Sequence, residues 1–414
     1  MATSPSPWER ASEGNEDVAA AFAERDTHLL DDSHGGRTDR MRKPSIAIAV
    51  SGLGRIRRGS ETWATDLAEA LHQQGAPVHL YAAGPVATSV PTTRLPTLSR
   101  TSVFLQFLSP RHRYLIEQRL FTRALLRQLR THRPDVIHLT DPQVAWWTRE
   151  ALRNSGPPVF YMDGLLLGPD WNWRFDHVQV LAPEYLDAAS RAGRETRGWR
   201  VIPHFVDPAQ FQPASNRQAE RARILGSVPP AAHLALAVGD FAPGSSKRLH
   251  YIVEEFARIP AGIRPHLLLV GNATVAEHRS LEEFSRRLLG HGVHIRTSLP
   301  RSEMAAVYRC ADVFVHAALR EPFGIVLLEA MASGLPVIGH DFPVTRWIIG
   351  EGGTAQNLEQ TGRLAETTSR ILVQPTLLQE LSAAARRRVL ENFSAAAVLP
   401  SYLASYEAIG QANV

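Results

Sequence analysis

Two glutamates eight positions apart, Glu321 and Glu329, form a pair whose type and spacing could do chemistry. They lie in R-E-P-F-G-I-V-L-L-E-A-M-A-S-G-L-P, which runs from Arg320 to Pro336. A carboxylate accepts hydrogen bonds at both oxygens, so it suits the diol of a sugar. The spacing alone equally allows two structural acids, one in a solvated loop and one capping a surface helix.

The segment around the glutamates predicts a strand, a loop and a helix. V-F-V-H at 313–316 is typical of a strand, and ligands of open α/β sheets bind where strands end. Pro322 fixes its own φ, and the glycine two residues later lets a backbone approach a ligand. The first amides of the helix lack intrahelical acceptors and favour phosphate. These amides belong to Phe323, Gly324, Ile325 and Val326.

The whole string from Glu321 to Ile338 resembles the Glu–any seven–Glu signature of retaining glycosyltransferase family 4, which has the GT-B fold. A weaker resemblance extends over residues 45–410. It implies that Glu321 contacts hydroxyls of a donor sugar, that Glu329 contacts the ribose, and that the four amides hold the diphosphate. Donor and acceptor would bind different domains, and the sugar would transfer with retention.

A lysine farther up the chain fits the same resemblance. A-V-G-D-F-A-P-G-S-S-K-R resembles the strand, loop and phosphate-binding lysine of the family, and Lys247 occupies the lysine position. An ammonium there would neutralise charge on the leaving diphosphate. The family usually has an Arg directly after the strand glycine, where this chain has Asp240, and Arg248 is the candidate substitute. The alternative for Lys247 is a solvated helix lysine.

Two further segments are candidates for donor binding. G-S-E-T-W at 59–63 opens a predicted helix and resembles the Gly-Gly-x-Glu loop of the family, so Gly59 would face the diphosphate from the opposite wall. I-R-T-S-L-P at 295–300, with Thr297, resembles the region of the family whose backbone usually reads the nucleotide base. An ordinary strand-to-helix turn explains the second segment equally well.

Asp163 marks a departure from the family. After the predicted strand P-V-F-Y-M the family often has a His near the reaction centre, and this chain has Asp163-Gly164. The carboxylate either bonds a substrate hydroxyl, as a catalytic residue, or caps the next turn. His138, at another predicted strand end, is more typical of a satisfied buried histidine.

The chain lacks the common metal signatures. It has no HExxH, CxxC or DxD motif, so we expect no metal and no cofactor beyond the nucleotide sugar. The single cysteine, Cys310, fits a reducing cytoplasm and predicts a small buried hydrophobe. The chain has no run of about 18 apolar residues, so we expect no transmembrane helix.

The alternation of predicted strands and helices indicates α/β architecture. At 414 residues, the chain is long enough for two or three domains. Its net charge of only +4 does not indicate nucleic-acid binding. We expect two Rossmann-like doubly wound domains facing a cleft. The predicted segments are a disordered polar tail at 1–43, an acceptor domain at 44–212, a donor domain at 213–385, and a helix at 386–414 that returns to the first domain.

A basic stretch at 100–133 has eight Arg and one Glu, interleaved with apolar residues. Such a segment can lie peripherally on the anionic inner face of a membrane, present a solvated basic face, or bind an acidic acceptor.

The leading hypothesis is a cytoplasmic, retaining, metal-independent glycosyltransferase. UDP-, GDP-, ADP- and dTDP-sugars are all candidate donors, and the acceptor is a small molecule, a glycan or a lipid-linked group. The alternatives are a nucleotide-sugar epimerase of the same fold and a non-catalytic nucleotide-binding partner subunit, which Asp163 and Asp240 favour. S-G-L-G-R-I is not the GxGxxG fingerprint, which argues against a dinucleotide oxidoreductase.

Overall fold

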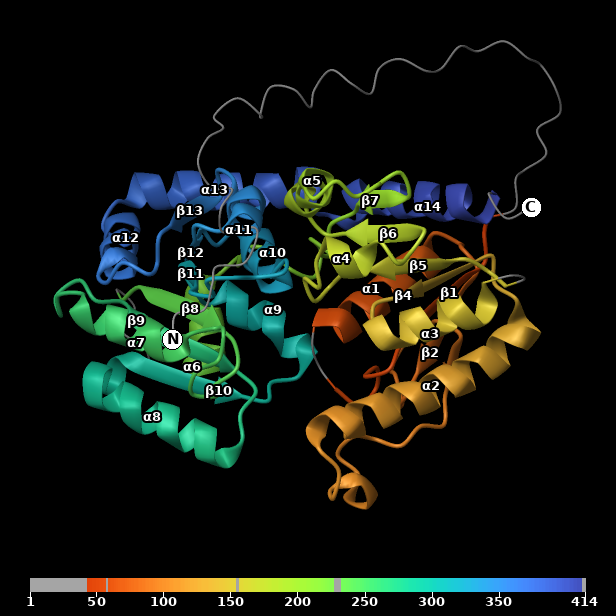
Figure 1. Ribbon diagram of the computed structural model, residues 1–414. Helices are drawn as coiled ribbons and strands as arrows, with labels where there is room; N and C mark the ends of the chain where they lie inside the picture. The colour runs from red at the N-terminus through yellow and green to blue at the C-terminus, as the bar shows by residue number, and fades with distance from the viewer. Residues whose placement is uncertain (1–42, 57–58, 154–155, 227–231, 412–414) are drawn as a thin grey trace, which may run out of the picture. The chain divides into compact units, whose positions relative to one another are not determined.

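The computed structural model describes residues 43–56, 59–153, 156–226 and 232–411. These residues form two parallel sheets with helices between the strands (Figure 1). The predicted α/β class with two Rossmann-like sheets is therefore confirmed. The tail predicted at 1–43 lies outside the described residues except for Lys43.

The first sheet has seven parallel strands in the order β3-β2-β1-β4-β5-β6-β7. Ile46 of β1 pairs with Val78 on one side and with Val136 on the other, so the strand order reverses between β1 and β4. Open α/β sheets bind ligands at the carboxyl end of such a reversal. The strands are β1 Ile46–Val50, β2 Val78–Ala82, β3 Thr92–Arg94, β4 Val136–Leu139, β5 Val159–Met162, β6 His177–Val180 and β7 Trp199–Val201.

The helices of this half cover both faces of the first sheet. Ile46 and Ile48 pack in one cluster with residues of α1 and α14, whereas Ala47 and Ala49 pack with α2 and α3. This division follows because successive side chains of a strand point to opposite faces. The helices are α1 Gly59–Gln73, the 3-10 turn η1 Val103–Leu105, α2 Pro110–His132, α3 Pro142–Leu152, α4 Pro169–Asn172 and α5 Pro183–Arg191.

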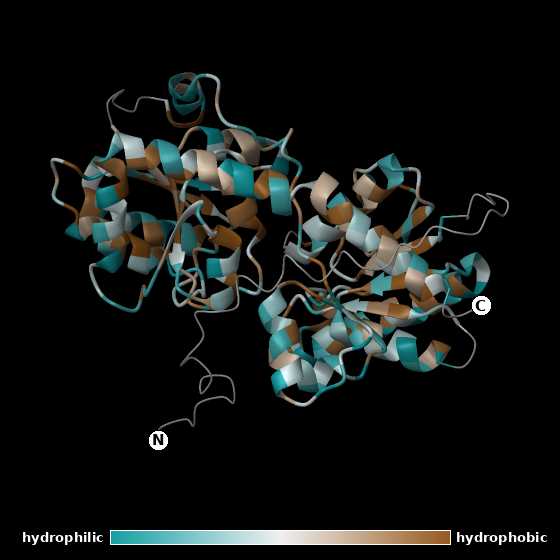
Figure 2. Ribbon diagram, turned by 90° about the horizontal axis from the view of Figure 1, so that it is seen from above, coloured by the Kyte–Doolittle hydropathy of each residue, from teal (hydrophilic) through white to brown (hydrophobic). Residues whose placement is uncertain are grey.

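The second sheet has six parallel strands in the order β10-β9-β8-β11-β12-β13, with its reversal between β8 and β11. Leu234 and Leu236 of β8 face α9, α10 and α13, and Ala235 and Ala237 face α7, α8 and α12. The strands are β8 Leu234–Val238, β9 His266–Gly271, β10 Val293–Thr297, β11 Val313–His316, β12 Val337–His340 and β13 Gly353–Gln356. Figure 2 shows the apolar colouring concentrated on the strands and the inward sides of the helices.

The helices of the second half are α6 Arg217–Leu225, α7 Leu249–Arg258, α8 Val275–Leu289, the 3-10 turn η2 Gly290–Gly292, α9 Arg301–Arg309, α10 Ile325–Ala332, α11 Pro343–Ile349, α12 Arg363–Leu372, α13 Pro375–Asn392 and α14 Ala395–Gln411.

The stretch predicted as one helix at 386–414 contains the end of α13 and all of α14. Directly after α13, the carbonyl of Phe393 accepts a hydrogen bond from the amide of Val206, 3.0 Å away, and Ser394 forms an isolated parallel β-bridge with Val206. α14 then contacts α1 and β4 of the first half. The predicted boundary at 386 falls within α13, and the predicted domain limits stay predictions.

Candidate active site

Glu321 lies in the loop between β11 and α10. Its side chain is buried, with the residue 6% exposed. Gly324, at the start of α10, has a φ of 87°, and a Cβ there would lie 2.9 Å from the Cγ of Glu321. Both the positive φ and the lack of space require glycine at this position. The loop is anchored from α5, since the hydroxyl of Tyr185 donates to the carbonyl of Pro322 at 2.7 Å.

One oxygen of Glu321 receives two donors. Lys247 Nζ contacts Oε2, and His316 Nε2 lies 2.8 Å from the same atom. Burial by itself would raise the pKa of this carboxyl, but the hydrogen bonds and charges of His316 and Lys247 outweigh it and lower the pKa to about 2. Glu321 is therefore a carboxylate at neutral pH.

Lys247 and Arg248 occupy the loop between β8 and α7. The ammonium of Lys247 pairs with Glu321 while 26% of its side chain stays exposed, which differs from a free solvated lysine. Arg248 precedes α7 with a φ of 52° and donates to the carbonyls of Ala317 and Leu358 at 3.3 and 3.2 Å. Its guanidinium lies 3.9 Å from the ring of Tyr251. Arg248 thus binds the backbone at the end of β11.

Glu329 lies in the second turn of α10, 8% exposed, in a different environment. Its Oε2 accepts a hydrogen bond from the hydroxyl of Tyr308 on α9 at 2.7 Å. Burial raises the pKa of Glu329 to about 7, although the charge of Arg301 and the Tyr308 hydrogen bond oppose the rise. Arg301 is itself paired with Asp66 of α1 at 2.5 Å. The two glutamates therefore have different partners, which lower the pKa of Glu321, whereas burial raises the pKa of Glu329.

The start of α10 has the predicted free amides. The first internal bond of the helix runs from the amide of Leu327 to the carbonyl of Gly324 at 2.9 Å. Among the described residues, the amides of Ile325 and Val326 donate to no backbone carbonyl. Phe323 differs, because its side chain is buried edge-on against His204 with the ring centroids 5.0 Å apart. Its contribution to donor binding could only be its backbone.

Gly59 brings the first half to the same place. It begins α1, and a Cβ at this position would lie 3.9 Å from Cδ1 of Ile325. The glycine loop predicted from the sequence thus lies against the start of α10. Residues 57–58, just before it, are outside the described ranges.

Asp163 and Thr297 lie at other strand ends. Asp163 Oδ1 accepts the amides of Leu165 and Leu167, both at 3.2 Å, and Oδ2 accepts the side-chain amide of Asn172 at 2.7 Å. This carboxylate therefore caps its own loop, and its catalytic role stays a prediction. Thr297 is the last residue of β10, and its role in reading the base also stays a prediction.

Two site residues, His316 and Tyr308, were not predicted from the sequence. The signal for His316 was present, because V-F-V-H places a histidine at the carboxyl end of a strand five residues before Glu321. Tyr308 gave no such signal, since its contact with Glu329 depends on how α9 packs against α10. Cys310 is buried as predicted, and burial raises the pKa of its thiol to about 12.

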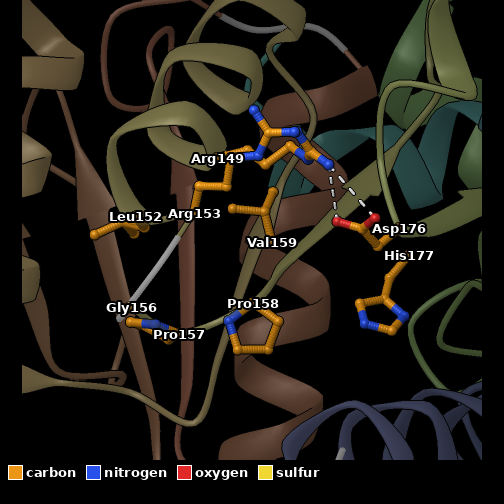
Figure 3. Close-up of a pocket in the computed structure, with 9 residues that line it drawn as sticks. All are labelled: Arg149, Leu152, Arg153, Gly156, Pro157, Pro158, Val159, Asp176 and His177. Atoms are coloured by element: carbon orange, nitrogen blue, oxygen red, sulfur yellow. Dashed lines mark hydrogen bonds and ion pairs between the residues drawn. The ribbon is translucent and has the colours of Figure 1, made fainter. Parts of the chain in front are cut away.

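A separate pocket of about 240 Å³ lies at the opposite edge of the first sheet, where β5 and β6 begin (Figure 3). Arg149 reaches across it to Asp176, with nitrogen–oxygen distances of 3.4 and 3.1 Å. None of the predicted site residues lines it, and open α/β sheets bind ligands at the other edge. Within the described ranges, no group of three His, Cys, Asp or Glu side chains forms a candidate metal site.

Both halves of the chain match known protein families. Residues 57–210 match the family described as Glycosyltransferase Family 4, and residues 229–388 match Glycosyl transferases group 1. The chain belongs to the family 4 type of GT-B glycosyltransferases. Residues 57–210 contain every strand of the first sheet except β1, and residues 229–388 contain all six strands of the second.

The relatives of this glycosyltransferase are named for different activities. It is 29% identical to the GDP-mannose-dependent alpha-mannosyltransferase of Mycobacterium tuberculosis, over 70% of this chain and 76% of that protein. It is 27% identical to the trehalose synthase of Pyrococcus horikoshii, over 57% of this chain and 58% of that protein. The chain thus matches less than two thirds of the second relative.

A solved structure shows the same fold. The sucrose-phosphate synthase from Thermosynechococcus elongatus superposes with a TM-score of 0.77 at 23% identity, covering 89% of this chain and 100% of that one.

Proposed function

We propose that this glycosyltransferase moves a sugar from a nucleotide-sugar donor to an acceptor with retention of anomeric configuration and without a metal. The observation that carries the proposal is the contact between Lys247 and the buried carboxylate of Glu321, beside the free amides at the start of α10. A cation and free amides suit a diphosphate, and a carboxylate suits sugar hydroxyls.

Donor binding would redistribute these contacts. The diphosphate competes with Glu321 for the ammonium of Lys247, since both are anions. Released from Lys247, the carboxylate of Glu321 can accept hydrogen bonds from the donor sugar. The amides of Ile325 and Val326 and the α10 dipole contribute further positive potential. Glu329, on the next turn, would accept from the ribose diol. Arg248 shapes this site by holding the end of β11.

The chemical step would break the bond between the anomeric carbon and the β-phosphate oxygen. The acceptor oxygen forms the new bond on the same face, and its proton passes to the departing phosphate oxygen. Negative charge grows on the diphosphate as the bond breaks, so Lys247 stabilises the transition state more than the ground state. In this scheme the lysine ammonium and the helix dipole stabilise the leaving group in place of a metal ion.

Thermal stabilisation identifies the donor first. UDP-, GDP-, ADP- and dTDP-sugars are each added to wild type, because a ligand at about 100 times its Kd stabilises a protein by about 2.7 kcal/mol. The stabilising donor is then incubated with candidate acceptors, and the anomeric configuration of the product is read by NMR. A retained product supports the proposal, and an inverted product contradicts it.

The same assay separates the alternatives. An epimerase would change the sugar of the donor without an acceptor, and a non-catalytic partner subunit would bind nucleotide without any turnover. The alternative of a non-catalytic partner subunit was favoured in part by Asp163, whose oxygens accept hydrogen bonds within its own loop.

We also propose peripheral contact with an anionic membrane on the cytoplasmic side, through the segment 100–133. Three apolar side chains at its tip are strongly exposed: Val103 at 69%, Phe104 at 74% and Phe107 at 81%. Three arginines, Arg119, Arg123 and Arg127, are exposed at intervals of four residues along α2, one helical face. Aromatic residues beside a basic helix face suit a bilayer interface. Among the described residues, no helix has both the length and the apolar character to cross a membrane.

A further inference from the structure

We propose that His316 is a positioning residue: it fixes Oε2 of Glu321 so that Oε1 is presented to the donor sugar. The inference rests on the proposed function, because Glu321 is assigned there to the sugar. It concerns a residue that neither the sequence motif nor the lysine loop includes.

The direction of the hydrogen bond follows from the chemistry of the two groups. Glu321 is ionised, and a carboxylate can only accept. His316 Nε2, 2.8 Å from Oε2, must therefore carry a proton and donate it. The imidazole is 2% exposed, so water does not compete for this bond.

The two oxygens of Glu321 are used unequally. Both Lys247 and His316 bond Oε2, while Oε1 has no hydrogen-bond partner among the described residues. When a donor diphosphate draws Lys247 away, His316 is the remaining donor to Oε2. The direction in which Oε1 points in the complex then depends on the histidine.

His316 is well placed to hold a side chain still. It ends β11, which pairs with β8 on one side and β12 on the other. Its ring lies nearly parallel to that of the fully buried Phe314, with an interplanar angle of 14° and the centroids 6.4 Å apart. A group on a central strand is fixed more precisely than one on a loop. By contrast, Glu321 itself is in a loop.

Two variants separate positioning from packing. His316→Phe keeps an aromatic ring and removes the donor, and His316→Gln keeps an N–H donor at a similar reach. The readout is the affinity that the sugar adds, measured by calorimetry as the ratio of Kd for free nucleotide to Kd for nucleotide sugar, using the nucleotide found in the stabilisation panel. We expect His316→Phe to reduce this ratio and turnover at least tenfold, with free-nucleotide Kd within twofold of wild type. His316→Gln should recover most of both.

A matched control is His138→Phe, which removes a buried histidine from β4, bonded to Tyr406 at 2.7 Å. The His138→Phe variant should have lower thermal stability but the same ratio of Kd for free nucleotide to Kd for nucleotide sugar as wild type. If His316→Phe leaves the ratio unchanged, or if free-nucleotide affinity falls in parallel, His316 is only structural and the inference is wrong.

A spectroscopic measurement does not depend on transfer. In protein with 15N-labelled histidine, the His316 side-chain signal, assigned by its loss in His316→Gln, should show a proton on Nε2. Glu321→Ala should shift this signal. An unprotonated Nε2 would refute the inference even if the enzyme transfers sugar. A protonated Nε2 without any transfer, by contrast, would refute only the proposed function.

Discussion

Glu329→Gln should stabilise the free protein at pH 8 and change its stability little at pH 5. Glu329 is buried on α10, and burial raises its pKa from 4.5 to about 7. Its ionisation therefore opposes folding. Glutamine has nearly the same shape, carries no charge, and can still accept the hydrogen bond that Tyr308 donates at 2.7 Å.

The magnitude follows from linkage between ionisation and folding. Because the folded-state pKa is raised, the stability associated with the protonated acid is complete below pH 4.5 and is lost as the pH rises through 7. Raising the pKa from 4.5 to about 7 corresponds to about 3 kcal/mol at pH 8, because a change of one in pKa is worth about 1.36 kcal/mol. At pH 5 the same relation leaves less than about 1 kcal/mol.

Urea unfolding of wild type and Glu329→Gln at pH 5, 6, 7 and 8 measures the difference directly. The difference in free energy of unfolding should grow with pH and level off near pH 8. Glu255→Gln is a matched control, because Glu255 is a buried carboxylate that accepts the amides of Gly362, Leu364 and Ala365. Losing those charge-assisted bonds should destabilise the protein at every pH. A flat Glu329→Gln difference between pH 5 and 8 would refute the burial argument.

Three further predictions concern the proposed activity and the proposed membrane contact. Glu321→Gln should lower turnover more than tenfold while free nucleotide still binds, and Lys247→Ala should lower turnover most. At pH 8, where Glu329 is mostly ionised, Glu329→Ala should weaken nucleotide binding by roughly 1.5–3 kcal/mol through loss of a charged hydrogen-bond partner. If Glu321→Gln loses nucleotide and Glu329→Ala keeps it, the ligand is placed in reverse. EDTA should leave turnover unchanged, and loss that Mg²⁺ or Mn²⁺ restores would show a metal-assisted leaving group. Sedimentation with anionic liposomes at low salt should be abolished when Arg119, Arg123 and Arg127 are changed together to Glu. If the wild-type protein does not sediment under these conditions, α2 has only a solvated basic face.

The local pattern of the chain predicted the elements better than their partners. On α1 the apolar residues Trp63, Ala64, Leu67, Ala68 and Leu71 recur at the helical period in the sequence, and all five are buried. Such periodicity is encoded within one helix. β3 and β13 were not predicted, because each is short, has no fully buried run, and is defined by pairing at a sheet edge.

The candidate site shows the same division. The resemblance to a family indicated Glu321 and Lys247, which lie 74 positions apart and contact each other in the structure. No sequence interval could reveal that His316 shares the same oxygen, or that Tyr308 bonds Glu329. These contacts arise from the pairing of strands and the packing of α9 against α10. The sequence also left the capping and catalytic alternatives for Asp163 open, and the structure adds three hydrogen bonds of the capping kind.

The return of α14 to the first sheet has a consequence for biosynthesis. The hydroxyl of Tyr402 accepts hydrogen bonds from Trp63 Nε1 at 3.0 Å and from Gln179 Nε2 at 2.8 Å, both in a buried setting. A ribosome makes Trp63 more than 300 residues before it makes Tyr402. Domains generally fold in the order in which they are made. Here the first half keeps an uncovered apolar face and unpaired polar groups until α14 has been translated, so we expect the nascent chain to need chaperones.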